Sequence, residues 1–194
     1  MKKLVLFLLF LALPALGEEQ RIDKVPASAE EFLALRSQLA STPEGGATCF
    51  IAAMLAYGNN PQLGRQCLVL ILDPSNVGPG DVYQGHAPSA SIRYHLDRLD
   101  GYKVWPYLGY AYLKGASPQN DYRVSAPFTV VTRRQRNSGE DSSGKVKIFL
   151  DVAGFRPRPI TLQRNDKGIW KALECSSMFL NVSPPASSAP KDDL

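Results

Sequence analysis

The chain has 194 residues and a formal net charge of +4, and 21% of its residues are charged. Loss of the first 17 residues, which include Lys2 and Lys3, lowers that charge by two, from +4 to +2. A charge this small argues against binding of nucleic acid or of an anionic membrane through net charge. Three cysteines are too few for a disulfide-supported scaffold, so a hydrophobic core is expected to hold the fold.

The N-terminus has the three parts of a secretory signal peptide. Lys2-Lys3 precedes an apolar run over 4–16, and Ala15 and Gly17 place small residues around a cleavage site. An uncleaved membrane anchor is the alternative, but the run is shorter than the roughly 20 residues that a spanning helix needs. We therefore predict a signal peptide over 1–17, export to the periplasm or the extracellular space, and no transmembrane segment after cleavage.

The first helix is predicted over 29–40, after a flexible linker over 18–27. Ser28 and Glu31 have the spacing of a capping box, and apolar residues then recur at helical spacing. The helix is expected to end at Thr42-Pro43 and Gly45-Gly46.

A buried helical hairpin is predicted next. Residues 47–57 carry no charge on any face, which is typical of a helix inside the core. Asn60 and Pro61 suit the N-cap and the first position of a further helix, which ends at Asp73-Pro74. The two helices are expected to form the centre of the core.

The helical part of the chain, about 28–101, closes with a loop and one more helix. Residues 75–88 are rich in Gly, Pro and Asn and are predicted to be a loop. An amphipathic helix follows from Pro88-Ser89, with Gly101 as its expected C-terminal cap.

After Pro106 the hydrophobic period changes from helical to alternating, which predicts a β part over about 104–182. A polar connection over 165–168 that ends in Gly indicates a hairpin. The order of elements predicts an α+β fold: one domain over 28–182, in which helices pack on an antiparallel sheet of about five strands. A disordered tail is predicted over 183–194. The predicted strands are 107–113, 128–132, 145–150, 159–163 and 169–175.

The cysteines leave two interpretations open. Cys49 and Cys67 could pair across the helical hairpin, but packed helix axes lie about 8–10 Å apart and a disulfide needs Cα atoms within about 7 Å. Buried free thiols that act as small apolar side chains are favoured.

No catalytic, metal-binding or cofactor-binding motif stands out. His86 and His95 are the only histidines, and neither has a partner at the spacing of metal ligands. Basic residues gather in the β half, where they either bind an anionic ligand or form an ordinary solvated face. The candidates for ligand contact are His86, Arg133, Arg158 and Lys171.

From about Ala47 onward the chain resembles DUF6935, an uncharacterised family of secreted bacterial proteins. The resemblance includes the apolar helix up to Tyr57-Gly58 and the segment 107–120. Its most specific part is Arg158-Pro159-Ile160-Thr161-Leu162 together with the block 165–171. The resemblance implies a shared fold and export, and it brings no activity, cofactor or site residue.

Together these observations predict a non-enzymatic exported domain that binds a cell-envelope component or a protein partner. The alternative is a hydrolase that acts on envelope material and uses His86 or His95 as its base. The surroundings of His86 distinguish the two, because a hydrolase needs a Ser, Asp or Cys beside it.

Overall fold

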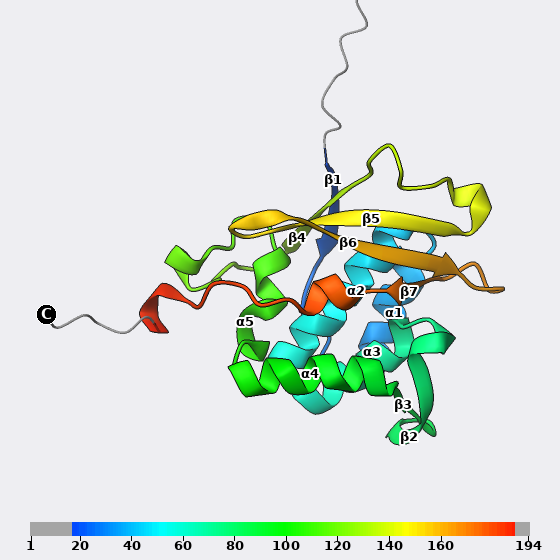
Figure 1. The fold of residues 1–194 in the computed structure, drawn as a ribbon, viewed down its shortest axis with the longest axis horizontal. Helices are drawn as coiled ribbons and strands as arrows, with labels where there is room; N and C mark the ends of the chain where they lie inside the picture. The colour runs from blue at the N-terminus through cyan, green and yellow to red at the C-terminus, as the bar shows by residue number, and fades with distance from the viewer. Residues whose placement is uncertain (1–16, 189–194) are drawn as a thin grey trace, which may run out of the picture.

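The computed structural model describes residues 17–188, and it confirms the predicted α+β fold (Figure 1). The helices lie together beneath an antiparallel five-stranded sheet, and a separate two-stranded hairpin projects from the helical side. The predicted signal peptide, 1–17, lies outside the described residues except for Gly17. The helices are α1 (Ala29–Leu39), α2 (Pro43–Asn59), α3 (Pro61–Ile71), α4 (Ala90–Tyr102) and α5 (Trp105–Leu108).

The sheet has the strand order β1-β4-β5-β6-β7, and all its neighbouring strands are antiparallel. The predicted hairpin over 165–168 is confirmed: Gly168 has a φ of 75°, and the Asn165 side chain accepts from Ile169 N at 2.9 Å. The strands are β1 (Glu18–Ile22), β4 (Phe128–Arg133), β5 (Lys145–Val152), β6 (Phe155–Arg164) and β7 (Trp170–Glu174), and the separate hairpin is β2 (Val77–Tyr83) and β3 (His86–Pro88).

Helix α2 forms the centre of the core, as predicted. It is buried from Pro43 through Tyr57 and packs between α1 and α3 on one side and the sheet on the other. The helix begins earlier than expected, since the Thr42 hydroxyl accepts from Gly45 N at 3.1 Å. Gly45 therefore lies in the first turn of α2 instead of ending α1. Only glycine fits at this position, because a Cβ there would stand 1.7 Å from Leu39 O.

The helical hairpin of α2 and α3 is also confirmed. The Asn60 side chain accepts from Gln62 N at 3.0 Å and from Leu63 N at 3.2 Å, so it is the N-cap of α3. All three cysteines are free and buried, and burial raises the pKa of each thiol to about 12. They act as small apolar side chains in the core.

The flexible linker predicted over 18–27 is wrong for its first half. Residues Glu18–Ile22 form β1, which pairs with β4 from Glu18↔Thr132 to Ile22↔Phe128. The segment is too polar to show an alternating pattern, but backbone pairing and the complete burial of Ile22 hold it in the sheet.

The strand predicted over 107–113 is also wrong. This stretch forms the end of α5 and a 3-10 turn over Tyr110–Tyr112, and only Leu113 makes a β-bridge, to Val130. Gly109 brings the turn against α2, since a Cβ there would lie 2.7 Å from the Met54 carbonyl carbon. Aromatic residues favour strands because of packing, and packing against α2 suits a helical turn here.

Two smaller predictions also need correction. Helix α4 continues past Gly101, and the left-handed residue at its end is Lys103, with a φ of 56°. The turn at Lys103 brings the buried Val104 into the core.

In the predicted disordered tail, residues 183–188 pack on the domain: Tyr122 Oη donates to Ser183 O at 2.6 Å, and Ser187 N donates to Asp121 at 2.9 Å. The rest of that tail lies outside the described residues.

Candidate functional site

A groove of about 520 Å³ lies where the end of α3, the β2–β3 hairpin and strand β7 meet. We call it the hairpin groove. Its walls are mostly apolar, and polar side chains stand at Tyr83, Gln84, His86 and Lys171. A volume of this size falls in the range of small-molecule sites, roughly 300–1,000 Å³. The apolar lining residues are Val69, Leu70, Leu72, Pro74, Val77 and Pro79.

The segment after α3 forms the floor between the helix and the sheet. Leu72 makes a parallel bridge to Ala172 in β7, and Asp73 N donates to Ala172 O at 2.9 Å. The Asn76 amide donates to Leu173 O at 2.6 Å. These bonds cover the open edge of β7 and fix the start of β2 beside it.

The outer wall is the β2–β3 hairpin, in the stretch 75–88 that the sequence predicted to be a loop. Its turn consists of Gln84 and Gly85, with φ angles of 47° and 81°, so Tyr83 and His86 pair across it. Two residues with positive φ give the twist that a tight hairpin requires. The Gly- and Pro-rich composition hid these short strands, because it is typical of loops and hairpins alike.

Lys171 reaches the groove from β7 and is largely buried. Its ammonium donates to Leu70 O at the end of α3, and the Arg36 guanidinium donates to the same oxygen at 2.7 Å. Burial, followed by repulsion from Arg36, lowers the pKa of Lys171 to about 8. Among the described residues no carboxylate lies within 4.0 Å of either cation.

Lys171→Met is expected to raise the free energy of unfolding by about 1 kcal/mol near neutral pH, because it removes a desolvated charge while Arg36 still donates to Leu70 O. The Lys171 pKa falls from 10.5 to about 8 on folding, so between these values the unfolded chain binds more protons. The wild type should therefore gain stability relative to the variant as the pH rises through this window.

Urea unfolding at neutral and at alkaline pH measures both effects. Lys145→Met is the control, because the ammonium of Lys145 is half-exposed beside Glu174. A Lys171→Met protein that is less stable than the wild type at neutral pH would show that the lysine serves the fold.

Of the four predicted contact residues, the structure brings His86 and Lys171 together at the groove and places Arg133 and Arg158 elsewhere. Arg133 makes a two-point ion pair with Asp151 across β4 and β5, at 2.7 and 2.6 Å. Arg158 is buried and donates to Leu180 O and Asn181 O, at 2.8 Å each, and to the Tyr112 hydroxyl. Arg158 thus holds the C-terminal segment on the sheet.

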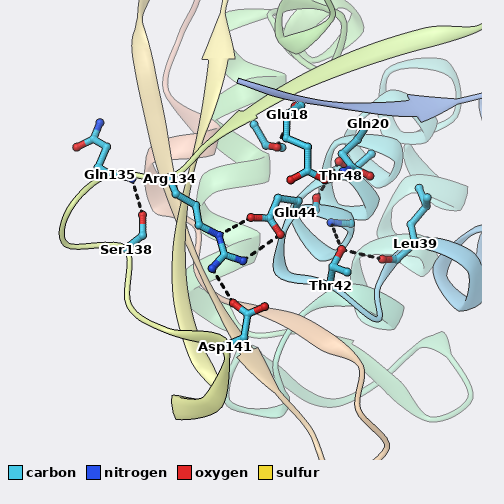
Figure 2. Close-up of polar contacts among 12 residues, drawn as sticks. Glu18, Gln20, Leu39, Thr42, Glu44, Thr48, Arg134, Gln135, Ser138 and Asp141 are labelled. Atoms are coloured by element: carbon cyan, nitrogen blue, oxygen red, sulfur yellow. Dashed lines mark hydrogen bonds and ion pairs between the residues drawn. The ribbon is translucent and has the colours of Figure 1, made fainter. Parts of the chain in front are cut away.

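A second polar cluster joins the helices to the sheet (Figure 2). The Glu44 carboxylate, in the first turn of α2, accepts from Arg134 Nε at 2.5 Å and from Nη2 at 3.2 Å. Arg134 Nη1 lies 2.7 Å from Asp141 in the loop before β5. Glu44 was not predicted from the sequence, where its one signal is that of a lone acid just after a Thr-Pro helix start. Every group in this cluster has a partner, so it serves packing.

In the described part of the chain, no hydrogen bond joins either histidine to a Ser, Cys, Asp or Glu side chain. His86 is exposed, and its Nδ1 donates to Gln84 O at 2.9 Å; the residues that line the groove beside it include no Ser, Cys, Asp or Glu. His95 stacks on Phe179, with 5.2 Å between ring centroids, and burial lowers its pKa. Within residues 17–188 no group of three or more His, Cys, Asp or Glu side chains is placed to hold a metal ion.

The fold and the groove define an α+β protein with an apolar groove at the edge of its sheet. The chain belongs to the DUF6935 family, a domain of unknown function whose model matches residues 24–186. This match confirms the resemblance that the sequence suggested. No curated protein and no solved structure matches the chain. In the described part of the chain, no helix combines the length and apolarity needed to cross a membrane.

Proposed function

We propose that this protein is a non-enzymatic binding module, exported to the cell envelope of a bacterium, that holds a small molecule with an apolar body in the hairpin groove. The observation that carries the proposal is the apolar lining of a cavity of about 520 Å³ that stays open to solvent. A ligand that covers apolar side chains at such an opening is stabilised by roughly 25 cal/mol for each Å² of apolar surface removed from water.

Export and a bacterial source belong to the same proposal. They rest on the signal-peptide pattern at the N-terminus, where a lysine pair precedes a short apolar run and small residues. The envelope then supplies the molecules that the groove meets.

The hydrolase alternative finds less support. A hydrolase needs a base within hydrogen-bond reach of a nucleophile or of its attacking water, and an acidic partner usually orients that base. His86 has a backbone carbonyl as its partner, and His95 stacks on a buried ring. Neither arrangement supports general-base catalysis, and the groove supports binding.

A fluorescence titration with N-phenyl-1-naphthylamine, a neutral apolar probe, tests the proposal. We expect saturable enhancement in the wild type and its loss in Val77→Trp, because the indole fills the groove beside β2. Val124→Trp is the matched control, since Val124 is also a half-buried valine packed on the core and does not line the groove.

Two results would overturn the proposal. One is a wild-type protein that gives no saturable enhancement. The other is equal probe binding by Val77→Trp and the wild type, which would place the probe at another surface.

A further inference from the structure

Two cations share one carbonyl oxygen at the end of α3. Lys171 lines the hairpin groove, and Arg36 lines a smaller hollow that Lys171 also lines. Lys171 from β7 and Arg36 from α1 each donate to Leu70 O. The end of α3 carries the partial negative charge of its last carbonyls, which attracts cations. One carbonyl dipole, however, is a weak partner for two full positive charges.

The groups around this end match only part of the charge. The nearest acid along the floor is Asp73, whose Oδ1 accepts from Ser75 N at 3.0 Å and from Ser75 Oγ at 2.7 Å. Tyr83 and His86 face the groove from the hairpin, and Asp166 and Lys167 lie with Arg36 and Lys171 around a smaller hollow at the β6–β7 turn. Lys167 and Asp166 offset one another, and Asp73 attracts Lys171 without forming an ion pair with it, so one positive charge remains in excess.

Arg36 also has a hydrogen-bond donor that nothing in the described chain accepts. Its Nε is buried and has no partner, although its Nη1 is bonded. Buried donors in native proteins are almost always satisfied, so an unmet one beside Lys171 calls for an acceptor such as a water or a ligand oxygen. A carboxylate oxygen accepts strongly from both guanidinium and ammonium groups.

We propose that the groove binds an aliphatic carboxylate, with its acid group beside Lys171 and its hydrocarbon chain along the apolar wall. This inference rests on the proposed function and names its ligand class. The apolar wall of Val69, Leu72 and Val77 suits the chain, and the Lys171 ammonium sets its direction. The carboxylate supplies the ion-pair partner that Lys171 does not have among the described side chains.

Isothermal titration with decanoate and with decanol tests the inference, because the two ligands share a chain length and differ in charge. We expect decanoate to bind the wild type about tenfold more tightly or better, the contribution of one charge-assisted hydrogen bond. In Lys171→Met the decanoate affinity should fall to that of decanol. Lys145→Met should keep the wild-type preference, because Lys145 lies outside the groove.

The outcomes separate the two proposals. Equal affinities of the wild type for decanoate and decanol would overturn the carboxylate inference and leave the binding function standing. A decanoate preference that survives in Lys171→Met would overturn it as well. Failure of both ligands to bind, together with failure of the neutral fluorescent probe, would overturn the binding function itself.

Discussion

Arg134→Met is expected to lower the free energy of unfolding by about 2–3 kcal/mol, because it strands the carboxylate of Glu44 in the core. The Glu44 side chain is only 7% exposed, and Arg134 supplies both of its side-chain hydrogen bonds. Water reaches Arg134, which is 37% exposed, and this access keeps the loss below the roughly 3–5 kcal/mol of fully buried pairs. Urea unfolding followed by circular dichroism measures the change.

The neighbouring Arg133→Met is the matched control. Arg133 pairs with Asp151 in the same two-point geometry, but both side chains are more than a third exposed, so we expect a loss below about 1 kcal/mol. The double variant Glu44→Met with Arg134→Met should recover much of the stability, since no charge is then left unpaired. Equal losses in Arg133→Met and Arg134→Met would contradict this account of the cluster.

Gly64→Ala is expected to cost about 3 kcal/mol, because it forces apart the two helices at the centre of the core. A Cβ at Gly64 would stand 2.2 Å from the Tyr57 Cα and 2.4 Å from its backbone nitrogen. These atoms belong to the backbone of α2, so no side-chain rotation relieves the overlap. Thermal and urea unfolding of the purified variant measure the loss.

Gly101→Ala provides the opposite control on α4. Nothing lies within 4 Å of a Cβ at Gly101, and the residue is inside a helix, so alanine should add about 0.5–1 kcal/mol through its higher helix propensity. A Gly64→Ala variant as stable as the wild type would disprove the close packing of α2 on α3.

The helices followed from the sequence because their signals are local. Ser28 and Asn60 cap α1 and α3 as their positions predict, and the charge-free run 47–57 lies in the core. Strand β1 gave no such signal, since its pairing with β4 joins residues more than a hundred positions apart. The segment 107–113 gave a misleading one, because tyrosines that pack on a helix have the same composition as a strand.

The candidate site could be predicted only in part. His86 and Lys171 were named from the sequence, but their meeting depends on how β7, α3 and the hairpin pack, which no local pattern encodes. Arg36 was missed although it follows the buried Phe32 by one helical turn, because a long charged side chain on such a face usually extends to solvent. Arg158 was misassigned, since a buried arginine that binds carbonyl groups has the same sequence signature as one that waits for a ligand.

Chemical-shift mapping of the ¹⁵N-labelled protein during titration with the neutral naphthylamine probe tests the central claim most directly. The account predicts that the amides which shift at saturation lie on the end of α3, the β2–β3 hairpin and β7, with residues 69–79 and 83–86 foremost. Shifts confined to another surface, or no saturable shift at all, would contradict it.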